Sequence, residues 1–240
     1  MITFFKRAHR IYSVGLILLL SALFYPLFYW ASRKPSRYSV LNRLRKINGL
    51  LWTSLIGVFF KFKFAAPLDD HQTYIYCANH ASTLDIIVFC CLAKGRFHFM
   101  GKDELLKNPV LKLFFKTIDI PVNRDSKMSS FRAFKRASEN LENGMGLIIF
   151  PEGKISDEYP PKLQDFKNGP FRLAIEKHIP IVPVSIQDVW KRMWDDGAAY
   201  GTSPGLCHIY VHKPVLTTDL TIDDTDQLKD RIFDLINSKL

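Results

Sequence analysis

The chain has 240 residues, which is enough for one globular domain with an appended segment and too few for a large multidomain assembly. Its 48% hydrophobic and 13% aromatic content excludes a disordered chain, because disordered chains cannot bury enough apolar surface. A net charge of +10 predicts an anionic partner, either nucleic acid or a membrane surface. The four cysteines form no CxxC pair, so neither a disulfide framework nor a zinc ribbon is expected, and a reducing compartment is predicted.

The basic excess is confined to the amino-terminal segment. Residues 1–64 contain eleven Lys and Arg and no acidic residue, and the first carboxylate of the chain is Asp69. The remaining 176 residues contain 22 basic and 23 acidic side chains, so their net charge is −1. Because the positive charge lies among long apolar runs and not on the rest of the chain, a membrane surface is favoured over nucleic acid as the partner.

Two apolar runs interrupt this basic segment. Between Arg10 and Arg33 the chain has 22 uncharged residues, and as a helix rising about 1.5 Å per residue they would cross a hydrocarbon layer of about 30 Å. Pro26 is expected to kink that helix. Residues 47–60 form a second uncharged run of 14 residues, which is too short to span a bilayer and predicts an interfacial or re-entrant helix.

Several topologies are compatible with these runs. A cleaved signal peptide is disfavoured because the first run is too long and no A-x-A-like site follows it. A single span with the bulk of the chain in the cytosol agrees with six Lys and Arg downstream against three upstream. A helical pair dipped into one leaflet fits equally, since basic residues flank the first run on both sides, whereas a buried core helix leaves the one-sided charge unexplained. We therefore predict a membrane anchor over residues 1–66 and a folded domain over residues 67–240.

From residue 70 onward, short apolar strands alternate with amphipathic helices. Strands are predicted at residues 74–78, 97–100, 118–122, 147–150, 181–186 and 207–212, and helices at residues 83–93, 129–143, 170–178 and 225–238, with further helical material before residue 116. This alternation predicts an α/β fold in which helices flank a mostly parallel sheet. In such folds the chemistry gathers in loops beyond the carboxyl ends of the strands.

The first such loop, residues 79–85, places a histidine near a carboxylate. Residues five apart cannot share one face of a helix, but His80 in the loop can meet Asp85 in the first helical turn. An aspartate bonded to one ring nitrogen leaves the other nitrogen as a base. Because the sequence has no G-x-S-x-G elbow and no cysteine in a nucleophile context, such a pair would deprotonate a substrate hydroxyl directly. The structural alternative is a capping box formed by Ser82 and Asp85.

A second loop follows the strand predicted to end at Phe150. It begins Pro151-Glu152-Gly153-Lys154, and a proline followed two residues later by glycine suits a tight turn. That turn would present the Glu152 carboxylate and open backbone amides at the sheet edge. The alternative is an ordinary solvated turn.

Two further sequence blocks accompany these loops, one between them in the chain and one after the second loop. Residues 101–105 (Gly-Lys-Asp-Glu-Leu) with residues 120–124 (Ile-Pro-Val-Asn-Arg) form one, and residues 166–169 (Phe-Lys-Asn-Gly) with residues 181–184 (Ile-Val-Pro-Val) form the other. Together with the two loops, these blocks resemble the glycerolipid acyltransferase family, in particular the 1-acylglycerol-3-phosphate O-acyltransferases. The resemblance covers roughly residues 74–186.

The resemblance implies direct acyl transfer to lysophosphatidate, which makes phosphatidate in phospholipid biosynthesis. His80 would be the general base and Asp85 would orient it, without a covalent acyl-enzyme. The donor would be acyl-CoA or acyl-carrier protein, with no cofactor and no metal. The enzyme would be bound to membrane lipids with its catalytic domain on the cytoplasmic face, and nucleic acid is not expected as a partner.

The resemblance also assigns residues to the substrates. The acceptor's glycerol phosphate would be bound by a set of basic and turn residues, namely Lys102, Arg124, Glu152, Gly153 and Lys154. Four further residues, Asn79, Pro151, Val182 and Pro183, would support the loops or shape the acyl channel.

One departure from the family pattern bears on the acceptor. The third block of the family commonly continues Gly-Thr-Arg-Ser, whereas here Gly153 is followed by Lys154 and Ile155. Lys154 would then take over phosphate binding from the missing arginine. Acylation of another lysolipid, such as an ornithine lipid or a lysophospholipid, therefore stays open. The alternative from another class is a non-catalytic membrane lipid-binding protein.

Overall fold

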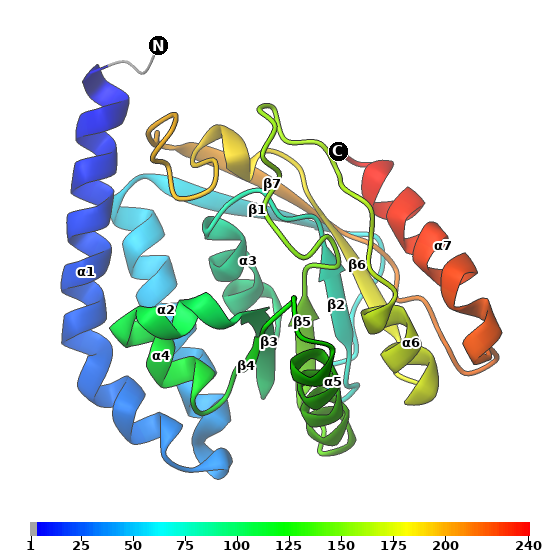
Figure 1. The fold of residues 1–240 in the computed structure, drawn as a ribbon. Coiled ribbons are helices and arrows are strands. Elements are labelled where there is room, and N and C mark those ends of the chain that lie inside the picture. Colours follow the sequence, from blue (N-terminus) through cyan, green and yellow to red (C-terminus); the bar gives the residue numbers. More distant parts are fainter. Residues whose placement is uncertain (1–3) are drawn as a thin grey trace.

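A computed structural model describes residues 4–240, and its centre is a seven-stranded sheet in the order β1-β7-β6-β2-β5-β3-β4 (Figure 1). The strands are β1 (Val58–Phe64), β2 (Ile75–Ala78), β3 (Phe97–Lys102), β4 (Ile120–Val122), β5 (Gly146–Ile149), β6 (Ile181–Ile186) and β7 (Gly205–Val211). All neighbouring strands run parallel except β6 and β7, which are antiparallel. The predicted α/β fold with a mostly parallel sheet is confirmed.

Helices cover both faces of this sheet. They are α1 (Phe4–Ser32), α2 (Tyr38–Leu55), α3 (Leu84–Leu92), α4 (Pro109–Phe115), α5 (Lys127–Glu142), α6 (Gly169–Glu176) and α7 (Thr225–Asn237), with short 3-10 turns at Pro35–Arg37, Asp103–Lys107, Val189–Lys191 and Ile222–Asp224. Along β2, Tyr76 and Ala78 pack toward α2 and α3, whereas Ile75 and Cys77 pack toward α5, α6 and α7. This alternation is the two-residue period of a strand that is buried on both faces.

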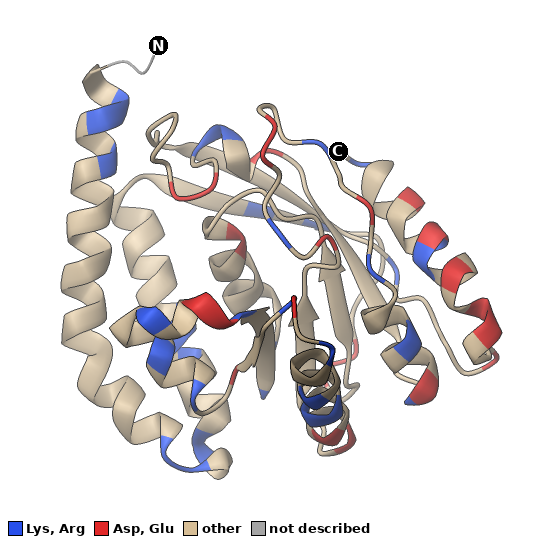
Figure 2. Cartoon of the chain, viewed as in Figure 1, with Lys and Arg blue, Asp and Glu red and all other residues tan. Residues whose placement is uncertain are grey.

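The first helix has the composition of a membrane-spanning segment. α1 is long and apolar enough to cross a bilayer, and only 17% of its most apolar window is buried. It contains Pro26 within its length. Figure 2 shows that the middle of α1 carries no charged residue, and that basic residues lie toward its two ends. A core helix would bury such side chains, so the exposure of α1 distinguishes it from one.

The second apolar run does not form the predicted helix over residues 47–60. Instead α2 already begins in the basic stretch at Tyr38 and ends at Leu55, and Gly57 turns the chain with a φ of +70°. Val58–Phe64 then forms β1, which pairs in parallel with β7. The physical reason is the alternation Phe-Lys-Phe-Lys-Phe, a two-residue period that favours a strand.

The position of β1 bears on the division into an anchor (residues 1–66) and a catalytic domain (residues 67–240). That division stays a prediction. β1 belongs to the first segment in sequence and to the sheet of the second in space.

A buried ion pair also ties α2 to the sheet. The Arg45 guanidinium donates to both carboxylate oxygens of Asp119, at 2.8 and 3.2 Å, and Asp119 accepts the backbone N–H of Phe99 at 2.9 Å. The guanidinium also lies over the rings of Phe99 and Phe114. Because both charges are almost fully buried, this pair holds α2 against β3 and the start of β4.

Candidate active site

The loop after β2 is held by its first residue. The Asn79 side chain donates to the carbonyl oxygen of Ile186 at 2.9 Å and accepts the N–H of the same residue at 2.8 Å. The buried amide therefore replaces a strand neighbour and joins the ends of β2 and β6. His80 follows directly at the carboxyl end of β2.

His80 and Asp85 are brought together as the spacing predicts. The His80 Nδ1 lies 2.9 Å from the Asp85 Oδ2, and the same oxygen accepts the backbone N–H groups of Ala81 and Ser82 at 2.9 Å each. Asp85 is fully buried, whereas 18% of the His80 side chain is exposed. Since an ionised carboxylate only accepts hydrogen bonds, Nδ1 carries the hydrogen and Nε2 is left as the base.

The alternative capping box is realised in part at this loop. Asp85 lies in the first turn of α3 and accepts the N–H of Ser82, while the Ser82 hydroxyl oxygen accepts the N–H of Leu84 at 3.1 Å. The second oxygen of Asp85 has no hydrogen-bond partner among residues 4–240. Asp85 therefore orders the loop and orients the imidazole at once.

An aromatic ring packs against one face of the imidazole. The Phe150 ring stacks on the His80 ring with centroids 4.0 Å apart and planes 14° apart. Phe150 also contacts Phe89 of α3 edge-on, at 5.7 Å. The imidazole is thus held in one plane by packing as well as by its hydrogen bond to Asp85.

Glu152 is buried and holds two loops together. Its Oε1 accepts the backbone N–H of His80 at 2.7 Å, and its Oε2 accepts that of Gln164 at 2.8 Å. Burial raises the pKa of Glu152 to about 7; the two amide hydrogen bonds oppose this shift and the nearby Asp85 adds to it. Both carboxylate oxygens accept backbone N–H groups, so Glu152 links the His80 loop to the segment that contains Gln164.

The basic residues predicted to bind phosphate lie near the surface. Lys102 forms an ion pair with Glu104 at 2.8 Å, and Lys154 forms one with Asp157. Arg124 lies largely exposed in the loop after β4. Partial loss of hydration lowers the pKa of its guanidinium, and the nearby carboxylates of Glu104 and Asp103 act in the opposite direction. Each of these cations is accessible to an anionic ligand.

The turn after β5 also has a basic neighbour that sequence reasoning did not single out. Gly153 has a φ of +81°, and its N–H donates to the carbonyl oxygen of Phe150 at 3.0 Å. A Cβ at this position would lie 3.1 Å from Cε and Nζ of Lys167. The backbone N–H of Lys167 in turn donates to Pro151 at 3.0 Å, so this lysine is fixed beside the turn. The Phe-Lys-x-Gly block is the sequence signal that carries it.

A small cleft of about 170 Å³ opens beside His80. Lys162, Trp190 and Lys191 lie along it and were not predicted as site residues. It is lined by Asn79, His80, Ala81, Glu152, Pro161, Lys162, Leu163, Ile186, Gln187, Trp190, Lys191 and Leu240. The cleft therefore combines the candidate base, an apolar wall and two cations.

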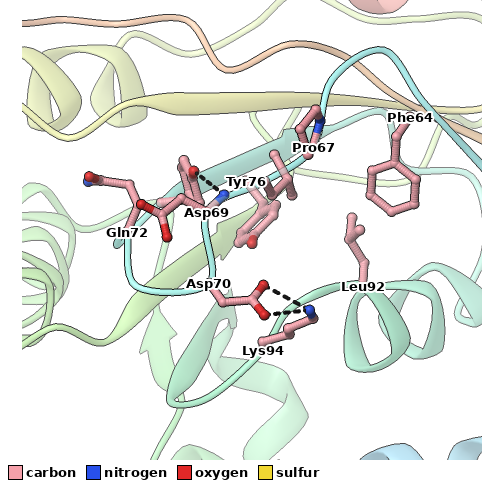
Figure 3. Close-up of a pocket in the computed structure, with 10 residues that line it drawn as sticks. Phe64, Pro67, Asp69, Asp70, Gln72, Tyr76, Leu92 and Lys94 are labelled. Atoms are coloured by element: carbon pink, nitrogen blue, oxygen red, sulfur yellow. Dashed lines mark hydrogen bonds and ion pairs between the residues drawn. The ribbon is translucent and has the colours of Figure 1, made fainter.

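A larger cavity of about 270 Å³ lies at the other end of the sheet (Figure 3). Phe64, Tyr76 and Leu92 form its apolar part, and an exposed ion pair between Asp70 and Lys94 at 2.7 Å borders it. This cavity lies at the start of β2, whereas the candidate base follows the end of that strand. This cavity is therefore separate from the cleft that His80 lines.

Metal ligation was tested from the geometry of the side chains. Across residues 4–240, no three His, Cys, Asp or Glu side chains are placed to hold a metal ion. The expectation of a reaction without metal or cofactor stays a prediction.

The sequence model of the acyltransferase family matches residues 60–187, which is more than half of the chain and includes both the His80 loop and the turn after β5. This chain belongs to the acyltransferase family. The resemblance inferred from the sequence blocks is thereby confirmed.

Curated relatives of this acyltransferase carry one recurring name. A chloroplastic 1-acyl-sn-glycerol-3-phosphate acyltransferase from Arabidopsis thaliana is 29% identical over 171 residues, which are 69% of this chain and 47% of that protein. The alpha form of the same enzyme from Mus musculus is 27% identical over 233 residues, which are 95% of this chain and 78% of the relative. The chain thus spans about half the length of the Arabidopsis relative.

A solved structure shares the fold of this acyltransferase. The crystal structure of the 1-acyl-sn-glycerophosphate acyltransferase from Thermotoga maritima aligns with a TM-score of 0.72 at 20% identity. The alignment covers 96% of this chain and 95% of that one. The amino-terminal helices are therefore included in the shared fold.

Two predicted channel residues of the acyltransferase lie away from the cleft. Val182 and Pro183 are buried within β6, where Val182 packs among the core side chains of α2 and α3. The same strand reaches the cleft only at its end, through Ile186 and Gln187. A role of Val182 and Pro183 in the acyl channel stays a prediction.

Proposed function

We propose that this acyltransferase moves a fatty acyl group from acyl-CoA or acyl-carrier protein to the free hydroxyl of 1-acylglycerol 3-phosphate, which makes phosphatidate. The observation that carries the proposal is the pair formed by a buried Asp85 and a partly exposed His80 at the edge of a cleft. Within the described part of the chain, the imidazole hydrogen bonds to Asp85 and to no serine or cysteine. The names of the relatives support lysophosphatidate as the acceptor.

The proposed reaction needs no nucleophile from the protein. Nε2 of His80 takes the proton of the acceptor hydroxyl as the hydroxyl oxygen attacks the thioester carbonyl. The tetrahedral intermediate then collapses, the carbon–sulfur bond breaks, and the imidazolium returns the proton to the departing thiolate. Asp85 stabilises the imidazolium and keeps Nδ1 protonated. General-base assistance of this kind is worth about 10²–10⁴-fold, so positioning of the two substrates supplies much of the remaining acceleration.

The acceptor's phosphate is assigned to the basic residues predicted from the sequence. Arg124 offers a fork that matches phosphate oxygens, and Lys102 and Lys154 offer point charges. Their exposure leaves them free to exchange their present carboxylate partners for a ligand. Lys167 adds a further cation beside Gly153.

A second acceptor is kept because of one residue. Ile155 stands where the family commonly has an arginine, so one phosphate contact is missing from the turn. This favours a lysolipid with a different head group, such as an ornithine lipid or a lysophospholipid, as the alternative acceptor. A non-catalytic lipid-binding protein is disfavoured because such a protein has no need for an oriented His80.

We also propose that the protein binds membrane lipids through its amino-terminal helices, with the catalytic domain on the cytoplasmic face. The support is the exposed apolar surface of α1 and the basic residues that follow it. Lys and Arg are enriched on the cytoplasmic side of membrane segments.

A panel of acceptors tests the proposed function. Purified full-length protein in vesicles receives labelled acyl-CoA together with lysophosphatidate, lysophosphatidylcholine, lysophosphatidylethanolamine or a lyso-ornithine lipid. We expect lysophosphatidate to give the highest kcat/KM. A clear preference for a head group without a terminal phosphate would replace the acceptor, and absence of transfer to every acceptor from acyl-CoA and from acyl-carrier protein would reject catalysis.

A further inference from the structure

The loop before β7 touches both α1 and the catalytic loop. This loop, residues 194–204, is named here the strap, and Figure 1 draws it in gold near the amino-terminal end of α1. It follows the 3-10 turn Val189–Lys191 and connects β6 to β7. Its contacts with two elements far apart in sequence give it a role beyond that of a connection.

At one end the strap is hydrogen bonded to α1. The His9 Nε2 lies 2.9 Å from the carbonyl oxygen of Ile56, and the His9 Nδ1 lies 2.6 Å from the Thr202 hydroxyl. A carbonyl only accepts, so Nε2 carries the hydrogen of the neutral ring and Nδ1 accepts from the Thr202 hydroxyl. The Thr202 N–H also donates to the carbonyl oxygen of Lys6, at 3.3 Å. Both polar groups of a buried threonine are thus directed at α1.

The backbone geometry shows that this contact is closely fitted. Gly201 has a φ of +71°, and a Cβ at this position would lie 2.8 Å from the Lys6 carbonyl oxygen. Only glycine satisfies both the left-handed backbone and the close approach. The strap therefore packs backbone against backbone on the first turns of α1.

At the other end the strap pairs with the His80 loop. The backbone N–H of Asp195 donates to the carbonyl oxygen of Ala81 at 2.9 Å. The carbonyl oxygen of Asp195 accepts the N–H of Thr83 at 3.0 Å and the Thr83 hydroxyl at 2.8 Å. Asp195 has a φ of +50°, an uncommon conformation for a residue with a side chain. In this conformation both of its backbone groups bond to residues that closely follow His80, namely Ala81 and Thr83.

Backbone contacts join the two ends of the strap. Met193 and Thr202 form an antiparallel bridge, and the N–H of Ser203 donates to Arg192 at 2.9 Å. The N–H of Gly201 donates to Gly197 at 2.8 Å. These bonds give a continuous path of contacts from His9 through the strap to Asp195.

We propose that the strap transmits the position of α1 to the His80 loop, and that His9 and Thr202 are positioning residues for the general base. α1 presents an exposed apolar surface, so the contact couples seating of this helix in lipid to the alignment of the imidazole. The coupling to catalysis rests on the proposed acyl transfer, whereas the mechanical link between α1 and the loop does not. Small misplacements of a catalytic group cost up to about 10²-fold in rate.

Two substitutions of Thr202 separate the effect of its hydroxyl from the effect of its side-chain shape. Thr202→Val keeps the shape and removes the hydroxyl, and Thr202→Ser keeps the hydroxyl. In full-length protein in vesicles of phosphatidylethanolamine and phosphatidylglycerol, with lysophosphatidate and acyl-CoA, we expect Thr202→Val to lower kcat about tenfold with little change in KM. Thr202→Ser is expected to stay near wild type. The matched control is Tyr12→Phe, which removes a 3.2 Å hydrogen bond from α1 to Leu55 that bypasses the strap.

Amide hydrogen exchange tests the link without any turnover. The Thr83 amide is protected by Asp195, so Thr202→Val should exchange it about tenfold faster, whereas Thr202→Ser and Tyr12→Phe should not. If Thr202→Val keeps the wild-type exchange rate and kcat, or if Tyr12→Phe changes both as much as Thr202→Val does, the proposed coupling through the strap is wrong. His9→Gln makes the same comparison if Thr202→Val fails to fold. If wild type transfers no acyl group, the proposed function fails, and the exchange result still decides whether the strap couples α1 to the loop.

Discussion

At the scale of single residues, one carboxylate oxygen serves three donors. The Asp85 Oδ2 accepts from the His80 ring and from the backbone of Ala81 and Ser82. The capping box and the catalytic pair were competing interpretations of the same spacing. Asp85 makes its own half of the capping box and also bonds to the His80 ring, whereas the catalytic role stays a prediction. A loop closed by the residue that orients the base has no freedom to misplace that base.

The pair was predictable because it is local in the chain. His80 and Asp85 are five residues apart across one strand-to-helix loop, so their meeting follows from the elements alone. The stacking of Phe150 on His80 and the position of Lys167 beside Gly153 were not predictable from periodicity, because these residues lie about 70 to 90 positions after His80; only the Phe-Lys-x-Gly block marked Lys167. Glu152 was predicted at the site as a substrate-binding residue, and that role stays a prediction; the structure shows both of its carboxylate oxygens bonded to backbone N–H groups.

Glu152 gives stability a pH dependence of known sign. Its pKa is raised from 4.5 to about 7, so the folded state binds the proton more tightly than the unfolded state. This contribution is complete below about pH 4.5 and is lost as the pH rises through about 7, and it amounts to about 2–4 kcal/mol. Thermal unfolding from pH 5 to 8 should therefore show wild type losing stability that Glu152→Gln does not lose.

The exposed Glu158 provides the control for that experiment. Glu158→Gln removes a carboxylate paired only with Lys162 at the surface, and it should leave the pH dependence of wild type in place. Parallel pH profiles for wild type and Glu152→Gln would contradict the assignment to Glu152.

At the scale of elements, α2 belongs to the folded domain as much as to the amino terminus. It is joined to the sheet through Arg45 and Asp119, and the chain continues directly into β1. The uncharged run at residues 47–60 concealed this boundary, because apolar content alone does not separate the end of a helix from the start of a buried strand. The alternation of Phe and Lys over residues 60–64 was the signal that identifies β1.

Breaking the buried ion pair should destabilise the fold strongly. Arg45→Met leaves the Asp119 charge buried without its partner, and we expect a loss of about 3–5 kcal/mol in the free energy of unfolding, measured in urea. Combining Arg45→Met with Asp119→Asn should recover part of the loss, because the amide oxygen still accepts the Phe99 N–H. The exposed Arg43→Met is the control, with an expected change within about 0.5 kcal/mol. A loss in Arg45→Met no larger than in Arg43→Met would refute this role.

At the scale of the whole molecule, the candidate site and the exposed apolar helix α1 are connected by direct contacts. α1 packs on α2 and α4 through Phe28 and Ala31, while most of its apolar length stays exposed. The charge asymmetry of the sequence identified this segment, but its contacts with the loop before β7 depend on residues about 190 positions away. Such contacts leave no mark in composition or periodicity.

The exposed face of α1 can be tested without disturbing the core. Leu19 and Leu23 are 57% and 64% exposed and lie one turn apart, and a charged residue at the centre of a membrane helix costs about 2.5–3.5 kcal/mol. The double substitution Leu19→Asp with Leu23→Asp should therefore weaken sedimentation with phosphatidylglycerol vesicles at least about 100-fold. Leu216→Asp alters an equally exposed leucine distant from α1 in sequence and should have no such effect. Unchanged vesicle binding in the double variant would show that lipid is bound elsewhere.

The central claim is that the His80 imidazole itself takes the proton from the acceptor hydroxyl. The most direct test is the steady-state rate of acyl transfer by full-length His80→Ala, at saturating acyl-CoA and lysophosphatidate, with unfolding temperature and vesicle binding matched to wild type. We predict a loss of kcat of at least about 10²–10⁴-fold. A folded, vesicle-bound His80→Ala protein that turns over at close to the wild-type rate would contradict it.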